Sequence, residues 1–202
     1  MTDSQAFDVN YAAEQLRRSR HPFRRAIKRF YLDAVLREVA GSTVDLGCGA
    51  GQLLRRLPVG SMGLEVNPAL VEALKKGGLE VARYDVGEDA FGLAPVAPGR
   101  FRSLVVSHVL EHFADAAVVI SALLRSCERL GIERVVVVVP GLRGYHSDAT
   151  HKTFIDLAYI DRNRLHRVGA FRLAKSRYFP INTERIGRYF VFHELILVFS
   201  AQ

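Results

Sequence analysis

Residues 43–51 read Thr-Val-Asp-Leu-Gly-Cys-Gly-Ala-Gly, an apolar strand pattern that runs through Asp45 into a glycine-rich turn. The glycines occupy alternate positions, at Gly47, Gly49 and Gly51. Glycine is needed where the backbone turns sharply or approaches a ligand with no Cβ in the way. A helical pattern, Gln52-Leu53-Leu54-Arg55-Arg56-Leu57, follows directly. A strand, a glycine turn and a helix N-terminus together predict a cradle for a nucleotide.

The composition is that of a globular chain. Its 202 residues suit one domain with a substantial core, and 49% of them are hydrophobic. The apolar run at 134–140 is too short to span a bilayer, and no signal segment opens the sequence. We therefore expect a cytoplasmic protein that does not insert into a membrane. Cys48 lies in the glycine turn and Cys127 in a helical pattern, which favours reduced thiols over a disulfide framework.

The net charge of +7 is unevenly distributed. Residues 1–40 hold 8 Lys and Arg against 5 Asp and Glu, and residues 140–202 hold 10 against 5. Residues 41–139 are close to neutral, with 10 against 11. Basic flanks predict anionic partners such as phosphates or nucleic acid, although solubility and surface ion pairs are the alternative explanation.

Strand and helix patterns alternate along the chain. Strands are predicted at 43–46, 62–66, 80–86, 103–107, 134–139, 171–179 and 189–200. Helices are predicted at 23–39, from Asn67-Pro68 to Gly77-Gly78, at 115–130 and at 154–167, after a basic helical segment that Pro22 interrupts. This alternation predicts a parallel sheet with helices on both faces, with the valine run at its buried centre.

The order Asp-x-Gly-x-Gly-x-Gly resembles the first motif of the class I S-adenosylmethionine-dependent methyltransferases of the type 11 and type 23 groups. The dinucleotide fingerprint would require glycine at position 52, where Gln52 stands. The resemblance covers about residues 43–139. It implies an α/β, Rossmann-like, seven-stranded sheet that is mostly parallel with an antiparallel closing strand. One domain over 1–202 would then comprise a helical basic segment (1–40), a donor-binding core (41–139) and a substrate side (140–202).

The resemblance also implies S-adenosylmethionine as cofactor and assigns its contacts. Glu65 ends the second strand, where the family's acid accepts both ribose hydroxyls, a task suited to a carboxylate. Asp85 matches the position that accepts from the adenine amino group, with the Val86 N–H on a ring nitrogen. Asp45 would orient the glycine turn and the methionine amino group. The expected cofactor-binding residues are Asp45, Gly47, Cys48, Gly49, Gly51, Glu65, Val66, Asp85, Val86, Ser107 and His108.

Residues 107–113 read Ser-His-Val-Leu-Glu-His-Phe and follow the fourth strand, where this family lines the sulfonium end of the donor. The same letters spell an inverted zinc-protease motif, but that motif belongs on a helix without a nucleotide cradle. Small-RNA 3′-terminal 2′-O-methyltransferases carry Glu-x-x-Glu-His here and a later histidine as metal ligands, whereas His108 replaces the first glutamate. We therefore expect no metal. The alternative metal ligands are Glu111, His112, His146 and His151.

The polar stretch at 145–152 follows the fifth strand and is predicted to face the acceptor. His151 is a candidate general base, because an imidazole titrates near working pH, and His108 is the second catalytic candidate. The further substrate-binding candidates are His112, Tyr145, His146, Asp148 and Thr150. The alternative is that Asp148 and Thr150 only cap the following helix.

These patterns favour a methyltransferase acting on an oxygen or nitrogen of an anionic small molecule or RNA. No Asp/Asn-Pro-Pro-Tyr follows the fourth strand, which argues against methylation of base amino groups, and the absent Pro-Cys nucleophile argues against cytosine-C5 chemistry. The alternatives are a metal-assisted RNA 2′-O-methyltransferase and an inactive methyltransferase fold that binds nucleic acid. Gln52 and the missing Tyr-x-x-x-Lys disfavour a nicotinamide oxidoreductase.

Overall fold

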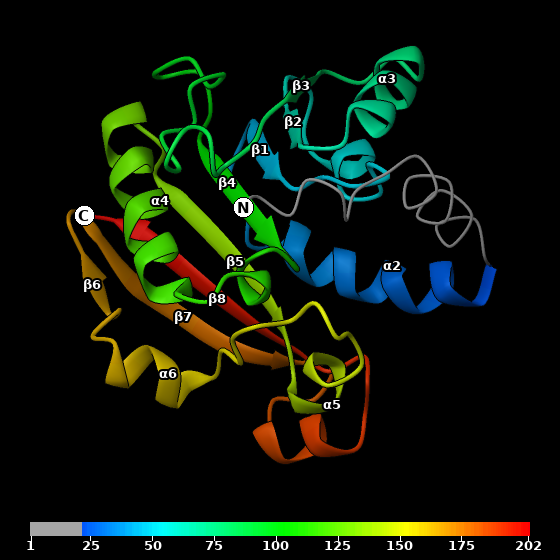
Figure 1. Ribbon diagram of the computed structural model, residues 1–202, viewed down its shortest axis with the longest axis vertical. Coiled ribbons are helices and arrows are strands. Elements are labelled where there is room, and N and C mark those ends of the chain that lie inside the picture. Colours follow the sequence, from blue (N-terminus) through cyan, green and yellow to red (C-terminus); the bar gives the residue numbers. More distant parts are fainter. Residues whose placement is uncertain (1–21) are drawn as a thin grey trace.

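The computed structural model describes residues 22–202, so the first half of the predicted basic N-terminal segment lies outside the described residues. Eight strands form one sheet in the order β3-β2-β1-β4-β5-β8-β7-β6 (Figure 1). Strands β1 to β5 run parallel to one another, β8 pairs antiparallel with β5, and β7 and β6 continue the antiparallel pairing. The strands are β1 (Thr43–Leu46), β2 (Met62–Glu65), β3 (Val81–Arg83), β4 (Ser103–Ser107), β5 (Arg134–Pro140), β6 (Arg167–Val168), β7 (Phe171–Phe179) and β8 (Glu194–Ala201).

The mostly parallel sheet with an antiparallel closing strand is confirmed, but the predicted count of seven strands is wrong. The extra strand is β6, which pairs with the start of β7 through Val168 and Phe171. Gly169 has φ +56° in the tight turn between them, a conformation that glycine adopts readily. A two-residue strand carries too little periodicity to be recognised in the sequence.

Helices cover both faces of the sheet, as Figure 1 shows. They are α2 (Pro22–Leu36), α3 (Pro68–Lys76), α4 (Ala116–Leu130), α5 (Leu142–Tyr145) and α6 (Leu157–Arg162), with 3₁₀ turns η2 (Leu54–Arg56), η3 (Leu110–His112) and η4 (Glu184–Arg188). The predicted cap at Asn67 is confirmed, because its side chain accepts from Ala69 N and Leu70 N at the start of α3. The Asp115 side chain likewise accepts from Val118 N at the start of α4.

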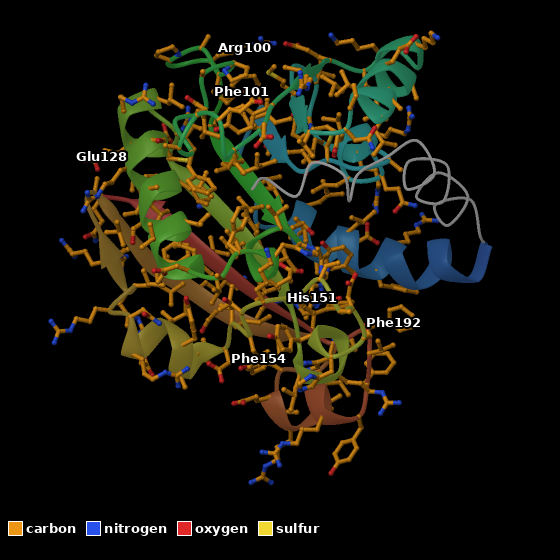
Figure 2. All side chains as sticks on the ribbon, viewed as in Figure 1. Arg100, Phe101, Glu128, His151, Phe154 and Phe192 are labelled. Atoms are coloured by element: carbon orange, nitrogen blue, oxygen red, sulfur yellow. The ribbon has the colours of Figure 1, made fainter. Side chains whose placement is uncertain are left out.

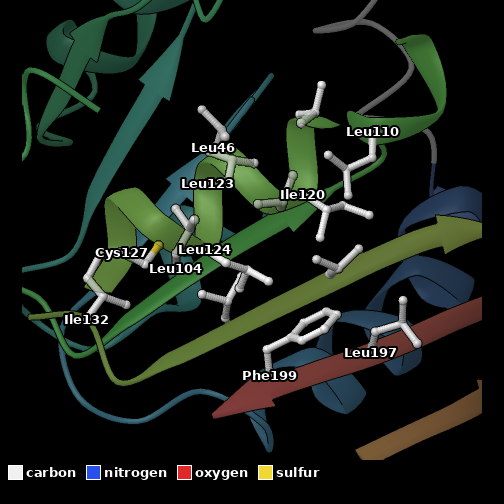
Figure 3. Close-up of a cluster of buried hydrophobic side chains, with 14 of the residues drawn as sticks. Leu46, Leu104, Leu110, Ile120, Leu123, Leu124, Cys127, Ile132, Leu197 and Phe199 are labelled. Atoms are coloured by element: carbon white, nitrogen blue, oxygen red, sulfur yellow. The ribbon is translucent and has the colours of Figure 1, made fainter. Parts of the chain in front are cut away.

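Strand β5 lies between two apolar layers. Val135, Val137 and Val139 pack into the cluster that contains α4, whereas Val136 and Val138 pack with α2. Figure 3 shows the first layer, where Ile120, Leu124 and Cys127 of α4 face Leu104 of β4 and Phe199 of β8. Because both faces of β5 are buried, its valine run needs no polar alternation.

Four predicted elements are shorter in the structure. The helix expected at 52–57 is reduced to η2, because Leu57 is extended before Pro58. The strand at 80–86 is only β3, since the Asp85 carboxylate accepts from Gly87 N at 2.8 Å and turns the chain. The helix at 154–167 is only α6, which Asp156 caps. The last strand begins at Glu194, the final residue paired with β5, so residues 189–193 are not a strand.

Cys48 and Cys127 are both buried and form no disulfide. No helix within residues 22–202 is long and apolar enough to cross a membrane.

Candidate functional site

The glycine turn lies at the carboxyl end of β1. Gly47, Gly49 and Gly51 have φ angles of +71°, +54° and +69°, which side-chain-bearing residues rarely adopt. A Cβ at Gly47 would lie 2.5 Å from Val109 Cγ2, whereas a Cβ at Gly49 would meet no atom within 4 Å. Gly47 therefore allows close packing, and Gly49 presents bare backbone to open space. This is the arrangement expected where a ligand rests against the main chain.

Glu65 connects the glycine turn to the end of β2. Its Oε2 accepts from Gly49 N at 2.7 Å, and its Oε1 accepts from Asn67 N at 3.0 Å. Burial raises the pKa of the Glu65 carboxyl, and the N–H donors of Asn67, Gly49 and Val66 oppose this rise. The acid predicted to bind ribose thus lies directly against the turn predicted to hold the rest of the nucleoside.

The other predicted donor residues lie along the same edge of the sheet. Tyr84 N donates to Glu65 O at 3.0 Å, which places the turn that contains Asp85 and Val86 next to the end of β2. Asp45 is 3% exposed in β1, between β2 and β4. The Cys48 thiol packs against Gly63, where an added Cβ would lie 2.7 Å from Sγ. Burial raises the pKa of that thiol, so Cys48 supports the turn from behind.

His108 follows β4 and lies between two buried carboxylates. Its Nδ1 is 3.3 Å from Glu111 Oε1, and its Nε2 is 3.4 Å from Glu194 Oε2. The backbone of His108 has φ +55°, a strained conformation of the kind that accumulates at functional sites. The ring also meets Tyr31 of α2 edge-on, with centroids 5.9 Å apart, and the Tyr31 hydroxyl hydrogen-bonds Ser107 Oγ.

Sequence reasoning missed Tyr31 and Glu194. Tyr31 lies on a helix with no motif, and its contact with Ser107 joins residues 76 positions apart. Glu194 did carry a signal, because it is the one acidic residue at the start of the otherwise apolar run Leu-Ile-Leu-Val-Phe. A carboxylate that is 8% exposed in such a strand indicates a specific role.

Glu111 is the centre of a second group of polar side chains. It is 1% exposed, and neither of its carboxylate oxygens accepts a hydrogen bond from the described residues. Its Oε1 is 3.8 Å from His151 Nε2. Its backbone carbonyl accepts from Lys152 N and Thr153 N, which docks the 145–153 loop onto η3. The loop thereby holds His151 against the carboxylate.

Hydrogen bonds orient the rings of two neighbouring histidines. His151 Nδ1 lies 2.8 Å from Tyr145 O, which can only accept, so Nδ1 donates and Nε2 faces Glu111. Thr150 Oγ1 donates to Asp148 Oδ1 at 2.7 Å and therefore accepts from His112 Nδ1 at 3.1 Å. Burial lowers the pKa of His112, which also favours its neutral form.

Glu111, His112 and His151 each present one potential ligand atom, and these atoms all lie within 4.8 Å of one another. A buried carboxylate beside two imidazoles is a donor set for a divalent cation. Each histidine also donates its other ring N–H to an oxygen, as metal-binding histidines commonly do. Of the four alternative ligands predicted, His146 is outside this group, because it is exposed and lies edge-on to the Tyr145 ring.

The alternative in which Asp148 and Thr150 cap a helix is wrong. Asp148 Oδ1 accepts from Thr150 N and Thr150 Oγ1 within the loop, whereas α6 begins later and is capped by Asp156.

Tyr145, one of the predicted acceptor-side residues, stacks on His151 with ring centroids 5.6 Å apart. The loop therefore folds back toward the end of β4.

Solved structures share this fold. A SAM-dependent methyltransferase from Archaeoglobus fulgidus superposes with a TM-score of 0.63 at 16% identity, over 96% of this chain and 100% of that one. Magnesium protoporphyrin IX methyltransferase from Synechocystis PCC 6803, with bound SAH, gives 0.64 at 13% identity over 99% and 98%. A chain of the Pnkp1/Rnl/Hen1 RNA repair complex gives 0.56 at 14% identity over 86% and 41%. At these identities the likeness shows the fold.

Residues 44–133 match the methyltransferase domain family, a range that includes the glycine turn, Glu65 and the end of β4. Over these residues the chain matches a methyltransferase domain, and its fold is that of S-adenosylmethionine-dependent methyltransferases. No curated protein matches the sequence of this methyltransferase.

Proposed function

We propose that this methyltransferase transfers the sulfonium methyl group of S-adenosylmethionine to an oxygen or nitrogen of an anionic acceptor. The observation that carries the proposal is the hydrogen bond from Gly49 N to Glu65, which joins the acid expected to bind the ribose to the glycine turn. In this proposal residues 41–139 bind the donor and residues 140–202 bind the acceptor within one domain. SAH in the Synechocystis structure supports the choice of donor.

The cradle fits an adenosyl group. Gly49 offers an uncrowded backbone face, and Glu65 offers carboxylate oxygens as acceptors for the two ribose hydroxyls. Asp85 and the Val86 N–H would bind the adenine edge, and Asp45 would bind the amino group. We infer that Ser107 and His108 line the end of the cradle nearest the reacting methyl group.

The donor supplies a methyl group that its positive sulfur already activates, so the protein chiefly aligns the nucleophile and excludes water. A proton must leave only if the acceptor is a hydroxyl or an ammonium group. His151 would suit that task, because its Nδ1 donates to Tyr145 O and Nε2 is the ring atom that would take up the proton. His108 is the second candidate base, held between Glu111 and Glu194.

The test is transfer of labelled methyl groups from S-adenosylmethionine into separate pools of total RNA and small metabolites. We expect label in one of the two pools with the native protein and in neither pool with boiled protein. Calorimetry with S-adenosylhomocysteine and NAD should show binding of the former alone. Binding of S-adenosylhomocysteine without transfer to either pool would favour the inactive, nucleic-acid-binding alternative, and no binding would overturn the proposal.

A second candidate is a metal-assisted methyltransferase acting on a ribose hydroxyl of RNA. The convergence of Glu111, His112 and His151 favours it, because these side chains would hold a divalent cation beside the end of β4. When bound, the cation would lower the pKa of a coordinated hydroxyl and make it a better nucleophile. The fold neighbour in the RNA repair complex agrees with this candidate.

Metal removal tests the second candidate. We expect exhaustive chelation to abolish transfer and Mn²⁺ or Mg²⁺ to restore it, whereas binding of S-adenosylhomocysteine should be unchanged by chelation. Full activity in the chelated protein would contradict the metal-assisted mechanism and leave His151 as the base.

A further inference from the structure

The segment between β7 and β8 exposes apolar and aromatic side chains. Tyr189 is 79% exposed, Phe190 38% and Ile181 56%, and the Phe190 and Phe192 rings meet edge-on at 5.8 Å. The sequence pattern predicts residues 189–193 as part of a strand, which would bury alternate side chains. We call Ile181, Tyr189, Phe190, Val191 and Phe192 the aromatic surface.

Arginines surround the aromatic surface. Arg185 and Arg188 lie in η4, and Arg143 lies in α5, which packs against η4. All three side chains are exposed, and none forms an ion pair with the described residues. Glu184 is the one acidic residue between 179 and 193. The surface therefore combines aromatic rings with a local excess of positive charge.

The aromatic surface is continuous with the acceptor side of the site. A Cβ at Gly144 would lie 3.0 Å from the Val191 carbonyl oxygen, so this segment packs directly on α5. The next residue, Tyr145, stacks on His151. In the view of Figure 2, Phe192 lies to the right of the loop that carries His151. A ligand lying on the aromatic surface would extend toward that histidine.

We propose that the aromatic surface binds single-stranded nucleic acid and guides it toward His151. Bases would stack on Tyr189 and Phe190, and the arginines would contact phosphates, the combination that single-strand-binding proteins use. A ring that is mostly exposed, as Tyr189 is, offers a face to a base without rearrangement. The inference rests on the proposed function, and it selects a polynucleotide among anionic acceptors.

Binding of fluorescein-labelled 20-mers of oligouridine and oligothymidine to the full chain tests this inference, with no donor present. We expect Tyr189→Ala and Phe190→Ala each to weaken binding about tenfold and Tyr189→Phe to retain affinity, because a phenyl ring still stacks. Arg188→Ala should reduce the slope of log K against log salt by about 0.7, the loss of one phosphate contact on a single strand. Arg125→Ala, an exposed arginine of α4, is the matched control and should bind like the wild type.

Circular dichroism and melting curves must first show that each variant is folded. Stronger binding of oligouridine assigns the surface to RNA, and stronger binding of oligothymidine assigns it to DNA. Wild-type affinity and salt slope in folded Tyr189→Ala, Phe190→Ala and Arg188→Ala would overturn the proposal. The proposal would also be overturned if Tyr189→Ala weakened binding to anionic phosphatidylserine vesicles, or weakened self-association, but left oligonucleotide binding unchanged. Because the donor is absent, these outcomes do not depend on whether methyl transfer occurs.

Discussion

Replacing Glu65 with alanine weakens the binding of S-adenosylhomocysteine by about 100-fold or more. The wild-type carboxylate would accept hydrogen bonds from both ribose hydroxyls, and hydrogen bonds to a charged group are each worth about 1.5–3 kcal/mol. The variant also leaves Gly49 N and Asn67 N without their present acceptor, which loosens the glycine turn. Isothermal titration calorimetry measures the change.

Glu72→Ala is the matched control for this prediction. Glu72 is an exposed glutamate of α3 that pairs with Lys76, so its removal should leave the affinity within about twofold. Melting curves separate lost affinity from lost folding. An affinity of Glu65→Ala within about threefold of the wild type would contradict the assignment of Glu65 to the ribose.

If Glu111, His112 and His151 bind a cation, Mn²⁺ raises the melting temperature of the wild-type protein, and replacing Glu111 with glutamine abolishes this increase and reduces methyl transfer by about 100-fold or more. The variant keeps the shape of the side chain but removes the charge that would hold the cation. Removing a metal ligand is at least as severe as removing its supporting hydrogen bonds, which costs about 10–100-fold. Differential scanning fluorimetry with and without Mn²⁺ provides the first measurement, and labelled transfer provides the second.

The same substitution should not destabilise the metal-free protein. Glu111 carries a buried carboxylate that accepts no hydrogen bond from the described residues and has the His108 and His151 imidazoles beside it, and burying a charge is costly. Its structural bonds to Lys152 N and Thr153 N use the backbone carbonyl, which the variant retains. We expect the free energy of unfolding to rise by about 1–3 kcal/mol. A persistent Mn²⁺ response, or a melting temperature several degrees below that of the exposed control Glu133→Gln, would contradict the metal site.

The donor side of the fold could be predicted because its information is local. The glycine turn, the cap at Asn67 and the acids near the ends of successive strands each depend on residues close together in the chain. Parallel strands then bring their carboxyl ends to one edge of the sheet, so the proximity of Glu65 to the glycine turn follows from the topology. The errors on this side are errors of length, as at η2 and β3, where Pro58 and the Asp85 turn end the elements early.

The acceptor side could be predicted only as a list of residues. The sequence placed His108, Glu111, His112 and His151 near the site, but it did not show that Glu111 lies between His108 and His151. Docking of the 145–153 loop on η3 produces that contact through two backbone hydrogen bonds to the Glu111 carbonyl. Backbone groups are the same in every residue, so such docking leaves no signature in the sequence.

The sequence by itself determined the class of fold and supplied the candidate residues of the nucleoside cradle, because these depend on motifs and periodicities within short stretches of chain. Only the tertiary structure decided that Tyr31 and Glu194 join His108, that His146 stays apart from Glu111, and that residues 189–192 form an exposed surface. These contacts join α2, β8 and two loops that are distant along the chain. Their geometry depends on how the whole sheet packs, and no local pattern of residue types encodes it.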